Sequence, residues 1–364
     1  MKLRKKAKKR LKNLLLITVI LIIFIVSYKT LHKEKDKPSS KIETLMKENN
    51  IDKKNYGKTL EYVLLNNIYD EKYLNEYADI KYNDQENFTD IITTFLPKGY
   101  KGKEINYLFK LSSKNLEYLK NMDYQDISLY YDYSNFNATN LERYNNYKKN
   151  NNIDIKDVIT KVNLNLDLPV YTNTKKVENP NDILVLVNKY NYLPKGYKPE
   201  DLVYLDGAYG NQVPVREVLK EDFLLLQKAA KNEININIMP TTAFRSEAFQ
   251  TTLYNNYVKS DGIEKADTYS ARPSYSEHQT GLAIDLRNMA LSKNIRFTDD
   301  DYNWLHDNVY KYGFIIRFPK EKEDITLYQF ENWHIRYVGK KAAKIIYENN
   351  LTLEEYIDKY VTNY

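Results

Sequence analysis

Apolar and polar positions alternate with two different periods in the C-terminal half of the chain, and these periods predict both strands and helices. From Ile234 to Ile238, isoleucine alternates with asparagine, which is the period of a half-buried strand. Three further apolar segments are strand candidates, at residues 282–286, 314–318 and 333–338. Helical patterns are expected at residues 215–231, 301–312, 340–348 and 352–361. Short loops separate these elements irregularly, which favours an α+β fold with a small, mainly antiparallel sheet and flanking helices.

An apolar run without charge covers residues 14–28 and follows eight cations and no acid in residues 1–12. The run is shorter than the ~20 residues of a usual membrane span, but Lys12 and Lys29 can extend their charged ends to the two interfaces. No pattern of small residues for cleavage follows the run, so an uncleaved signal anchor over residues 13–31 is expected rather than a cleaved signal peptide. The excess of cations then places the tail in the cytoplasm and the rest of the chain outside the membrane.

The chain after this run is polar and then helix-rich. Residues 32–42 contain Pro38-Ser39-Ser40 and are interpreted as a linker. Residues 43–165 are rich in Asn, Lys, Tyr and Ile, and helices are expected near 58–67 and 115–122. No residue of this N-terminal region is assigned any chemistry.

One hexapeptide, Leu-Pro-Lys-Gly-Tyr-Lys, stands at residues 96–101 and again at 193–198. Either it is a turn used twice, because Pro and Gly favour turns, or the two places belong to related small modules. A single match of this length does not establish a repeat protein.

Charge and cysteine content exclude several classes of function. The chain has 55 Lys and Arg against 49 Asp and Glu, and eight of the cations lie in residues 1–12, so the remainder carries 47 − 49 = −2. The folded part therefore lacks the positive footprint of a nucleic-acid-binding protein. The absence of cysteine excludes a disulfide scaffold, a thiol nucleophile, a cysteine zinc finger and an iron–sulfur cluster.

Two of the four histidines lie in polar segments typical of metal ligation. His278 precedes Asp285 by seven residues, and His334 lies on a different predicted strand. Two imidazoles and one carboxylate form a three-ligand zinc site whose fourth position is left for water. The alternative is that each segment holds only a hydrogen-bonded pair. His306 is expected on a helix face, and His32 in the linker is given no role.

Glu331 stands three residues before His334, and positions three apart on a regular strand face opposite sides. Both side chains can face one metal only if Glu331 lies on the loop before the strand or at a bulge. From there its carboxylate could take a proton from a zinc-bound water.

Four segments together resemble a known family. Residues 271–285 (ARPSYSEHQTGLAID) strongly resemble the VanY-type D-alanyl-D-alanine carboxypeptidases, zinc peptidases of the superfamily that includes the dipeptidase VanX and the hedgehog signalling domain. Three more segments match in order and spacing: Phe244-Arg245-Ser246 with Gln250, residues 312–319 (YGFIIRFP) and residues 331–339 (ENWHIRYVG). The resemblance covers residues 180–348 and does not cover residues 30–165.

The resemblance implies roles for seven residues. His278, Asp285 and His334 would bind zinc, and Glu331 would be the catalytic base. Arg245 would lie near the scissile carbonyl, where a guanidinium stabilises an oxyanion or binds a terminal carboxylate. The further substrate contacts would be Gln250 and Ser276. The chain departs from the family pattern at Ser274, where glycine is usual, and at Ala243-Phe244, and neither place is a ligand position.

Together with the anchor expected from the N-terminal residues, the resemblance implies a membrane-anchored zinc D,D-carboxypeptidase that hydrolyses the terminal D-alanine from peptidoglycan stem pentapeptides by zinc-activated water. The alternatives are an L,D-carboxypeptidase acting on tetrapeptides and an inactive zinc-holding module that binds the cell wall. Its partners would be the stem peptide and the membrane, without nucleic acid, and the oligomeric state is left open. The expected organisation is a basic tail at 1–12, an anchor at 13–31, a linker at 32–42, a region of unknown role at 43–165 and a carboxypeptidase domain at 166–364.

Overall fold

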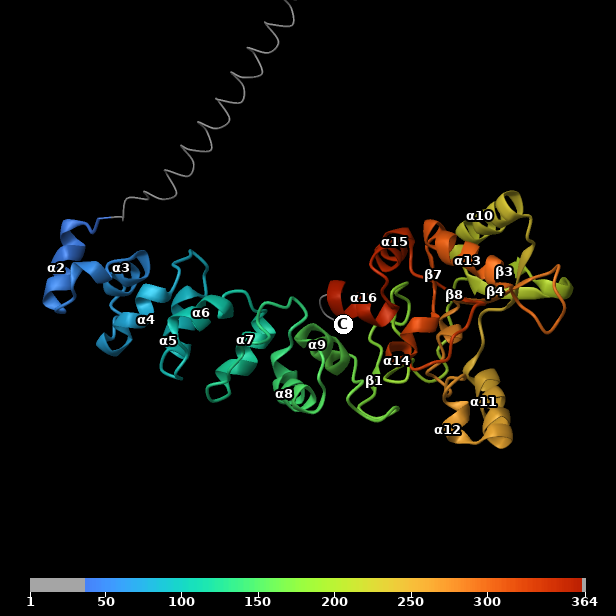
Figure 1. Cartoon of the computed structure of the whole chain (residues 1–364), viewed down its shortest axis with the longest axis horizontal. Helices are drawn as coiled ribbons and strands as arrows, with labels where there is room; N and C mark the ends of the chain where they lie inside the picture. Colours follow the sequence, from blue (N-terminus) through green and yellow to red (C-terminus); the bar gives the residue numbers. More distant parts are fainter. Residues whose placement is uncertain (1–36, 362–364) are drawn as a thin grey trace, which may run out of the picture. The chain divides into compact units, whose positions relative to one another are not determined.

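The computed structural model describes residues 37–361, and the chain divides into two compact units, with the boundary after Asp126 (Figure 1). The boundary was expected between residues 165 and 166, whereas residues 127–165 belong to the same compact unit as the C-terminal half. No helix within residues 37–361 is long and apolar enough to cross a membrane. The anchor expected at residues 13–31 lies outside the described residues.

The described part of the first unit consists of helices and turns. Its α-helices are α2 (Ser40–Glu48), α3 (Lys58–Leu65), α4 (Leu74–Asp79), α5 (Phe88–Phe95), α6 (Gly102–Leu108) and α7 (Ser113–Lys120), and two 3₁₀ turns lie at η1 (Lys53–Asn55) and η2 (Glu71–Tyr73). The helices expected near 58–67 and 115–122 are therefore confirmed as α3 and α7. Neighbouring helices pack through fully buried apolar side chains such as Ile91, Phe95 and Leu108.

The repeated hexapeptide forms a turn in both places. Gly99 has φ +102° and Gly196 has φ +70°, and both values lie in the left-handed region that favours glycine. The first copy connects α5 to α6, and the second follows β2 (Asn191–Tyr192). These geometries support a turn used twice.

The second unit opens with two helices, α8 (Leu141–Asn150) and α9 (Ile155–Asn163), which pack against each other, and a 3₁₀ turn at η3 (Ala138–Asn140) precedes α8. Helix α9 also contacts the C-terminal helix α16 (Leu353–Tyr360). Asn163 on α9 donates a hydrogen bond of 2.7 Å from Nδ2 to Oδ1 of Asp358 on α16. This contact is one reason why residues 127–165 belong to the unit that contains the predicted carboxypeptidase segments.

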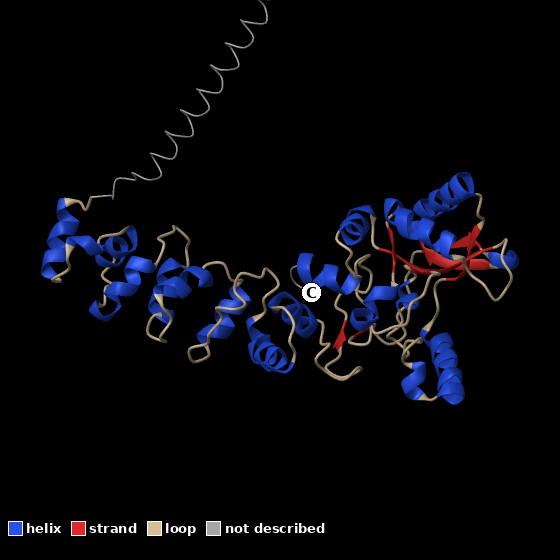
Figure 2. Cartoon of the chain, viewed as in Figure 1, coloured by secondary structure: helices blue, strands red, loops and turns tan. Residues whose placement is uncertain are grey.

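A four-stranded antiparallel sheet forms the centre of the second unit, in the order β5 (Ile238–Thr242), β6 (Ala283–Asn288), β8 (His334–Tyr337) and β7 (Phe314–Ile316). The antiparallel ribbon of β3 (Leu202–Asp206) and β4 (Gln212–Arg216) was not anticipated, and β1 (Lys175–Lys176) pairs with β2 in parallel. The α+β fold with small, mainly antiparallel sheets is confirmed (Figure 2).

The remaining helices are α10 (Glu217–Ile234), α11 (Glu247–Asp261), α12 (Ile263–Ala266), α13 (Asp299–Asn308), α14 (Glu323–Thr326), α15 (Lys340–Glu348) and α16, with 3₁₀ turns at η4 (Ala208–Gly210), η5 (Glu277–Thr280), η6 (Val309–Tyr312) and η7 (Lys320–Lys322). Figure 1 shows α11 and α12 together as a helical hairpin set apart from α10, α13 and α15. The strand predicted at residues 234–238 is wrong: α10 continues to Ile234, and Asn235 ends it in the left-handed conformation at φ 54°.

The two faces of the central sheet differ in polarity. Leu282 just before β6, together with Ile284 and Leu286 on it, belongs to the same core cluster as Phe223 of α10. Side chains alternate between the faces of a strand, so Asp285 points to the opposite side. On β8, Ile335 belongs to the core cluster, and its neighbours His334 and Arg336 are buried polar residues. One face of the sheet is thus apolar, while the other holds charged side chains.

Candidate active site

A cavity of about 530 Å³ opens on the polar side of the sheet. His278, Asp285, Glu331 and His334 line it, together with Arg245. These residues come from four separate segments: the loop after β5, the turn η5, strand β6, and β8 with the loop that leads into it. All seven residues singled out in the sequence lie on the wall of this one cavity, including Gln250 and Ser276.

Three ligand atoms converge in this cavity. One atom each of His278, Asp285 and His334 lies within 4.8 Å of the others, and all three residues are buried. The distance from Asp285 Oδ1 is 3.5 Å to His278 Nε2 and 3.4 Å to His334 Nδ1. Asp285 and His334 are direct partners in the register of β6 and β8, so strand pairing alone brings these two side chains together.

The turn after His278 brings the third ligand to the same place. His278 lies in η5, and Gly281 ends this turn at φ +68°. The His278 carbonyl accepts hydrogen bonds from the backbone N–H groups of Gly281, at 3.1 Å, and Arg245, at 3.2 Å. The segment that carries Arg245 and the segment that carries His278 are therefore held together by their backbones.

Hydrogen bonds select which nitrogen of each imidazole faces the other ligands. Nδ1 of His278 lies 2.7 Å from the carbonyl oxygen of Ala243, which can only accept, so Nδ1 carries the proton and Nε2 is left as the ligand atom. Nε2 of His334 lies 2.8 Å from Glu277 Oε1 and donates to this carboxylate, so Nδ1 is left as the ligand atom. The two imidazoles thus use different nitrogens.

The donor set fits zinc. Two neutral imidazole nitrogens and one carboxylate oxygen are the usual ligands of a catalytic zinc ion, which keeps a further position for water. Asp285 Oδ1 is buried and has no hydrogen-bond partner within residues 37–361, although buried polar atoms are normally paired. A cation bound between the three ligands satisfies this oxygen.

Burial and neighbouring charges set the protonation of the ligands. Burial lowers the pKa of His278 to about 4, helped by the Arg245 guanidinium, so this imidazole is neutral at pH 7. Burial acts against ionisation of Asp285, but the two imidazoles and Arg245 outweigh it and hold the pKa of this carboxyl well below its usual range. Burial also acts to lower the pKa of His334, but hydrogen bonds with Glu277 and Glu331 raise it to about 9 in the metal-free chain.

Glu331 lies on the loop just before β8, as its spacing from His334 requires. Its backbone N–H donates to the Phe318 carbonyl at 3.1 Å, which fixes the loop against the end of β7. Its Oε2 lies 3.2 Å from Nδ1 of His334, the nitrogen assigned as a ligand atom. The side chain is 15% exposed, so it borders the metal position while remaining open to the cavity.

Arg245 follows β5 and precedes α11, whose first turn is capped by the Ser246 hydroxyl accepting from the Phe249 N–H at 3.2 Å. Burial lowers the pKa of the Arg245 guanidinium, against the opposing effect of Asp285 and Glu331. Nε of Arg245 has no hydrogen-bond partner within the described chain. An unpaired buried donor in a polar cavity is suited to an anionic group of a ligand.

Gln250 and Ser276 are both almost fully buried in the cavity wall. Nε2 of Gln250 donates to the carbonyl of Ala271 at 2.7 Å, so this amide supports the loop that leads to His278. Oε1 of Gln250 has no partner within residues 37–361 and is available as an acceptor.

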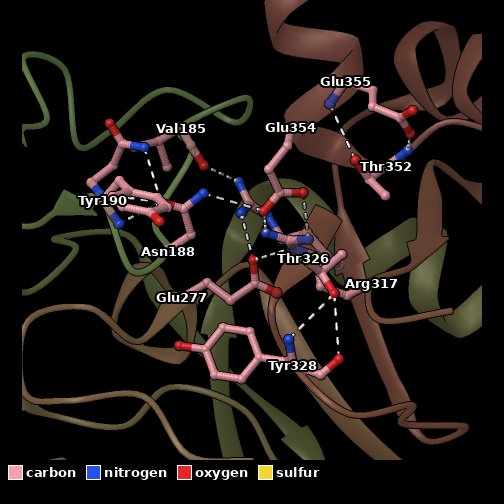
Figure 3. A network of polar contacts seen from close by, with 12 residues as sticks. Val185, Asn188, Tyr190, Glu277, Arg317, Thr326, Tyr328, Thr352, Glu354 and Glu355 are labelled. Atoms are coloured by element: carbon pink, nitrogen blue, oxygen red, sulfur yellow. Dashed lines mark hydrogen bonds and ion pairs between the residues drawn. The ribbon is translucent and has the colours of Figure 1, made fainter. Parts of the chain in front are cut away.

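Three charged residues that were assigned no role from the sequence, Glu277, Arg317 and Arg336, form a buried network behind His334. Figure 3 shows Glu277 and Arg317 of this network. The sequence offers one indication of two of these residues. Arg317 and Arg336 each stand inside short apolar strand segments, where a charged side chain needs a buried partner. His306, expected on a helix face, is confirmed on α13, with its side chain about half exposed.

The chain is similar to known carboxypeptidases over its C-terminal half. Residues 212–340 match the family model of VanY, described as D-alanyl-D-alanine carboxypeptidase. The chain is 43% identical over 200 residues to the putative carboxypeptidase YodJ of Bacillus subtilis, covering 53% of this chain and 73% of that protein. It is 33% identical over 186 residues to the bifunctional D-Ala-D-Ala dipeptidase and carboxypeptidase VanXYC of Enterococcus gallinarum, covering 48% and 93%.

Two solved structures are similar over the same part of the chain. The LD-carboxypeptidase LdcB shares 42% identity at a TM-score of 0.48, covering 52% of this chain and 91% of that structure. VanYB in complex with D-alanine-D-alanine shares 33% identity at a TM-score of 0.42, covering 49% and 98%.

Proposed function

The chain belongs to the VanY family of D-alanyl-D-alanine carboxypeptidases, which are zinc metallopeptidases, and we propose that it removes the terminal D-alanine from peptidoglycan stem pentapeptides. The observation that carries the proposal is the convergence of His278, Asp285 and His334 beside Glu331 in one cavity. Each of these residues has the chemical type that a zinc-dependent hydrolysis needs.

Zinc would be held by Nε2 of His278, Oδ1 of Asp285 and Nδ1 of His334. When bound, it supplies a Lewis acid that polarises a carbonyl group and makes water a nucleophile at neutral pH. The cross-strand pairing of Asp285 with His334, and the hydrogen bonds on the outer nitrogens of both imidazoles, fix these ligands before any substrate binds.

Glu331 acts as the general base in this proposal. Its carboxylate takes a proton from the attacking water and later passes that proton to the amine of the departing D-alanine. Glu331 stands three residues before His334. Because it lies on a loop rather than on the strand, its carboxylate can face the same side of the cavity as the zinc ligands.

Arg245 stabilises the oxyanion that develops on the scissile carbonyl, or binds the terminal carboxylate of the substrate, since its guanidinium carries an unpaired buried donor. The free Oε1 of Gln250 accepts a hydrogen bond from the peptide, and Ser276 borders the same space. A cavity of about 530 Å³ has room for the end of a peptide.

Release of D-alanine tests the proposal and separates it from the alternatives. Zinc-loaded full-length protein would be incubated in parallel with muropeptide pentapeptide and tetrapeptide, with and without a chelator, and D-alanine would be followed by mass spectrometry. Chelator-sensitive release from the pentapeptide is expected. Release from the tetrapeptide alone would identify an L,D-carboxypeptidase. No release from either, with one zinc still bound per chain, would favour the inactive wall-binding module.

The location outside a membrane is a separate part of the proposal. It is supported by the apolar run at residues 14–28 and the eight cations before it. N-terminal sequencing of the mature protein tests the anchor, because an uncleaved anchor predicts that residues 1–28 are retained. A mature chain that starts after residue 28 would contradict it.

A further inference from the structure

The imidazole of His334 is held from behind by a buried chain of charged groups that ends on the C-terminal helix α16. Nε2 of His334 donates to Oε1 of Glu277 at 2.8 Å. The other oxygen of Glu277, Oε2, accepts from Nε of Arg317 at 2.8 Å and from Nη1 of Arg336 at 3.1 Å. The two Nη atoms of Arg317 then donate to the two carboxylate oxygens of Glu354, at 2.9 and 2.6 Å.

Figure 3 shows Glu277, Arg317 and Glu354 pointing toward one another inside the protein. Their exposed fractions are 4%, 1% and 1%, and Arg336 is fully buried. Buried charges of this kind are costly unless each one is paired and hydrogen-bonded. The network therefore belongs to the protein interior, where each charge depends on its partners, and is not a set of surface ion pairs.

The hydrogen bonds of Arg317 are divided between two carboxylates. Glu354 occupies both Nη atoms, which leaves only Nε for Glu277. A guanidinium without this partner would turn its paired donors to the nearest carboxylate, since the bidentate arrangement is the stronger one. That carboxylate is Glu277, and the change would draw it away from the imidazole of His334.

The charges of the network also balance. Glu277 and Glu354 carry two negative charges, and Arg317 and Arg336 carry two positive charges. Loss of the Glu354 charge would leave one buried positive charge uncompensated. This charge would be separated from the zinc ligand His334 only by the side chain of Glu277. Charges interact strongly where water is excluded, so the excess charge would act against metal binding.

From these contacts we propose that Glu354 is a positioning residue of the zinc site, acting through Arg317 and Glu277 to hold the imidazole of His334 with Nδ1 toward the metal. The inference rests on His334 being a zinc ligand, as in the proposed function, but it concerns zinc affinity and not turnover. The segment involved lies beyond residue 348, where the sequence resemblance ends.

Helix α16 is also held in place through Asp358, which accepts hydrogen bonds from two asparagines. Glu354 lies one helical turn before Asp358, which accepts hydrogen bonds from Asn163 on α9 and from Asn135. The residues that precede the carboxypeptidase segments in the chain therefore help to hold the helix that carries Glu354. This arrangement gives residues 127–165 a connection to the zinc ligand through four side chains.

The test compares zinc affinity in two full-length variants that differ by one position. Glu354→Gln keeps the size of the side chain and removes its charge. The matched control is Glu355→Gln, on the same helix, whose carboxylate pairs with Lys322 at 3.1 Å instead of with Arg317. Zinc dissociation constants would be measured by competition with a chromophoric chelator, after circular dichroism has shown that both apo proteins are folded.

Glu354→Gln is expected to weaken zinc binding by about 10-fold, the lower end of the usual effect of residues that support metal ligands. Glu355→Gln is expected to change it by less than about 2-fold, because the glutamine can keep the hydrogen bond with the Thr352 N–H that caps α16 and the lost ion pair involves Lys322 rather than Arg317. An unchanged zinc affinity in Glu354→Gln, with or without a lower unfolding temperature, would reduce Glu354 to a purely structural role and overturn the proposal.

A double variant tests the route of the effect. If Glu354 acts through Glu277, then Glu354→Gln has little further effect in a Glu277→Gln background. Equal losses in both backgrounds would contradict the route. Should Glu354→Gln not fold, Glu354→Asp takes its place, because it keeps the charge but is too short to keep both contacts with Arg317. A loss of about 3-fold is then expected, and unchanged affinity would overturn the proposal.

Discussion

Replacement of Glu331 by glutamine separates proton transfer from metal binding. The change keeps the shape of the side chain, which lies on the cavity wall with 15% of its surface exposed, so little packing is lost. The amide cannot accept a proton as the carboxylate can. Glu331 is not one of the three converging ligands, so zinc should stay bound in the variant.

The size of the effect follows from the role of a positioned general base, which contributes about 10²- to 10⁴-fold to a rate. At about 1.4 kcal/mol for each factor of ten, this corresponds to roughly 3–5 kcal/mol of transition-state stabilisation. We therefore expect kcat to fall by at least about 100-fold, with the larger part of the loss in kcat rather than KM. Zinc affinity should change by no more than about 3-fold, since Glu331 is not one of the three converging ligands.

The assay is D-alanine release under zinc saturation, combined with metal analysis of the same samples. Glu321→Gln is the matched control, because this acid lies in the exposed turn η7 before the same loop and does not line the cavity. Turnover within about 10-fold of the wild type in Glu331→Gln would refute the assignment of the base. Loss of zinc together with activity would instead make Glu331 a part of the metal site.

Three further outcomes are expected. His278→Ala removes one of three ligands, so it should bind no zinc at micromolar concentrations and release no D-alanine. Metal analysis and the same D-alanine assay measure this, and retained stoichiometric zinc would contradict the site. Phe223→Ala should destabilise the second unit by about 3–5 kcal/mol in urea unfolding, because this fully buried ring packs on Phe314 with centroids 6.1 Å apart. A decrease in the free energy of unfolding below about 1 kcal/mol would contradict this packing. Burial raises the pKa of Asp358 to about 6, so the folded chain takes up a proton between about pH 6 and 4 that the unfolded chain does not. Lowering the pH from 7.5 to 5 should therefore favour the wild type over Asp358→Asn by about 1 kcal/mol in urea unfolding, and parallel stabilities at the two pH values would contradict this.

Local sequence determined several helices of the second unit. Helix α15 covers residues 340–348 as predicted, since its apolar positions repeat with the helical period. Helix α16 begins after Thr352, whose hydroxyl accepts from the Glu355 N–H at 3.1 Å while Glu355 accepts from the Thr352 N–H. This capping box is visible in the sequence, because it involves only residues three positions apart.

The same reasoning failed where local pattern and tertiary structure compete. The alternating isoleucines at residues 234–238 predicted a strand, but α10 extends to Ile234 and the strand β5 begins only at Ile238. Asn235 adopts the left-handed conformation that ends a helix, and asparagine tolerates it. The ribbon of β3 and β4 was also not predicted, because pairing between strands depends on residues that are not neighbours in the chain.

The residue types of the active site could be identified from the sequence, because His278, Asp285, Glu331 and His334 stand in motifs with specific spacing. Only the tertiary structure decided how they meet. Asp285 and His334 are 49 positions apart and become neighbours through the register of two antiparallel strands, which long-range hydrogen bonding selects.

The choice of ligand nitrogen and the support from Glu354 were likewise beyond the sequence. Which ring nitrogen faces the metal depends on the partner of the other one, the Ala243 carbonyl for His278 and Glu277 for His334. A buried charge network has no period or motif in the chain, because its members are chosen by proximity after folding. Sequence therefore determined which chemical groups are present and which helices form, while packing decided which atoms of those groups face one another.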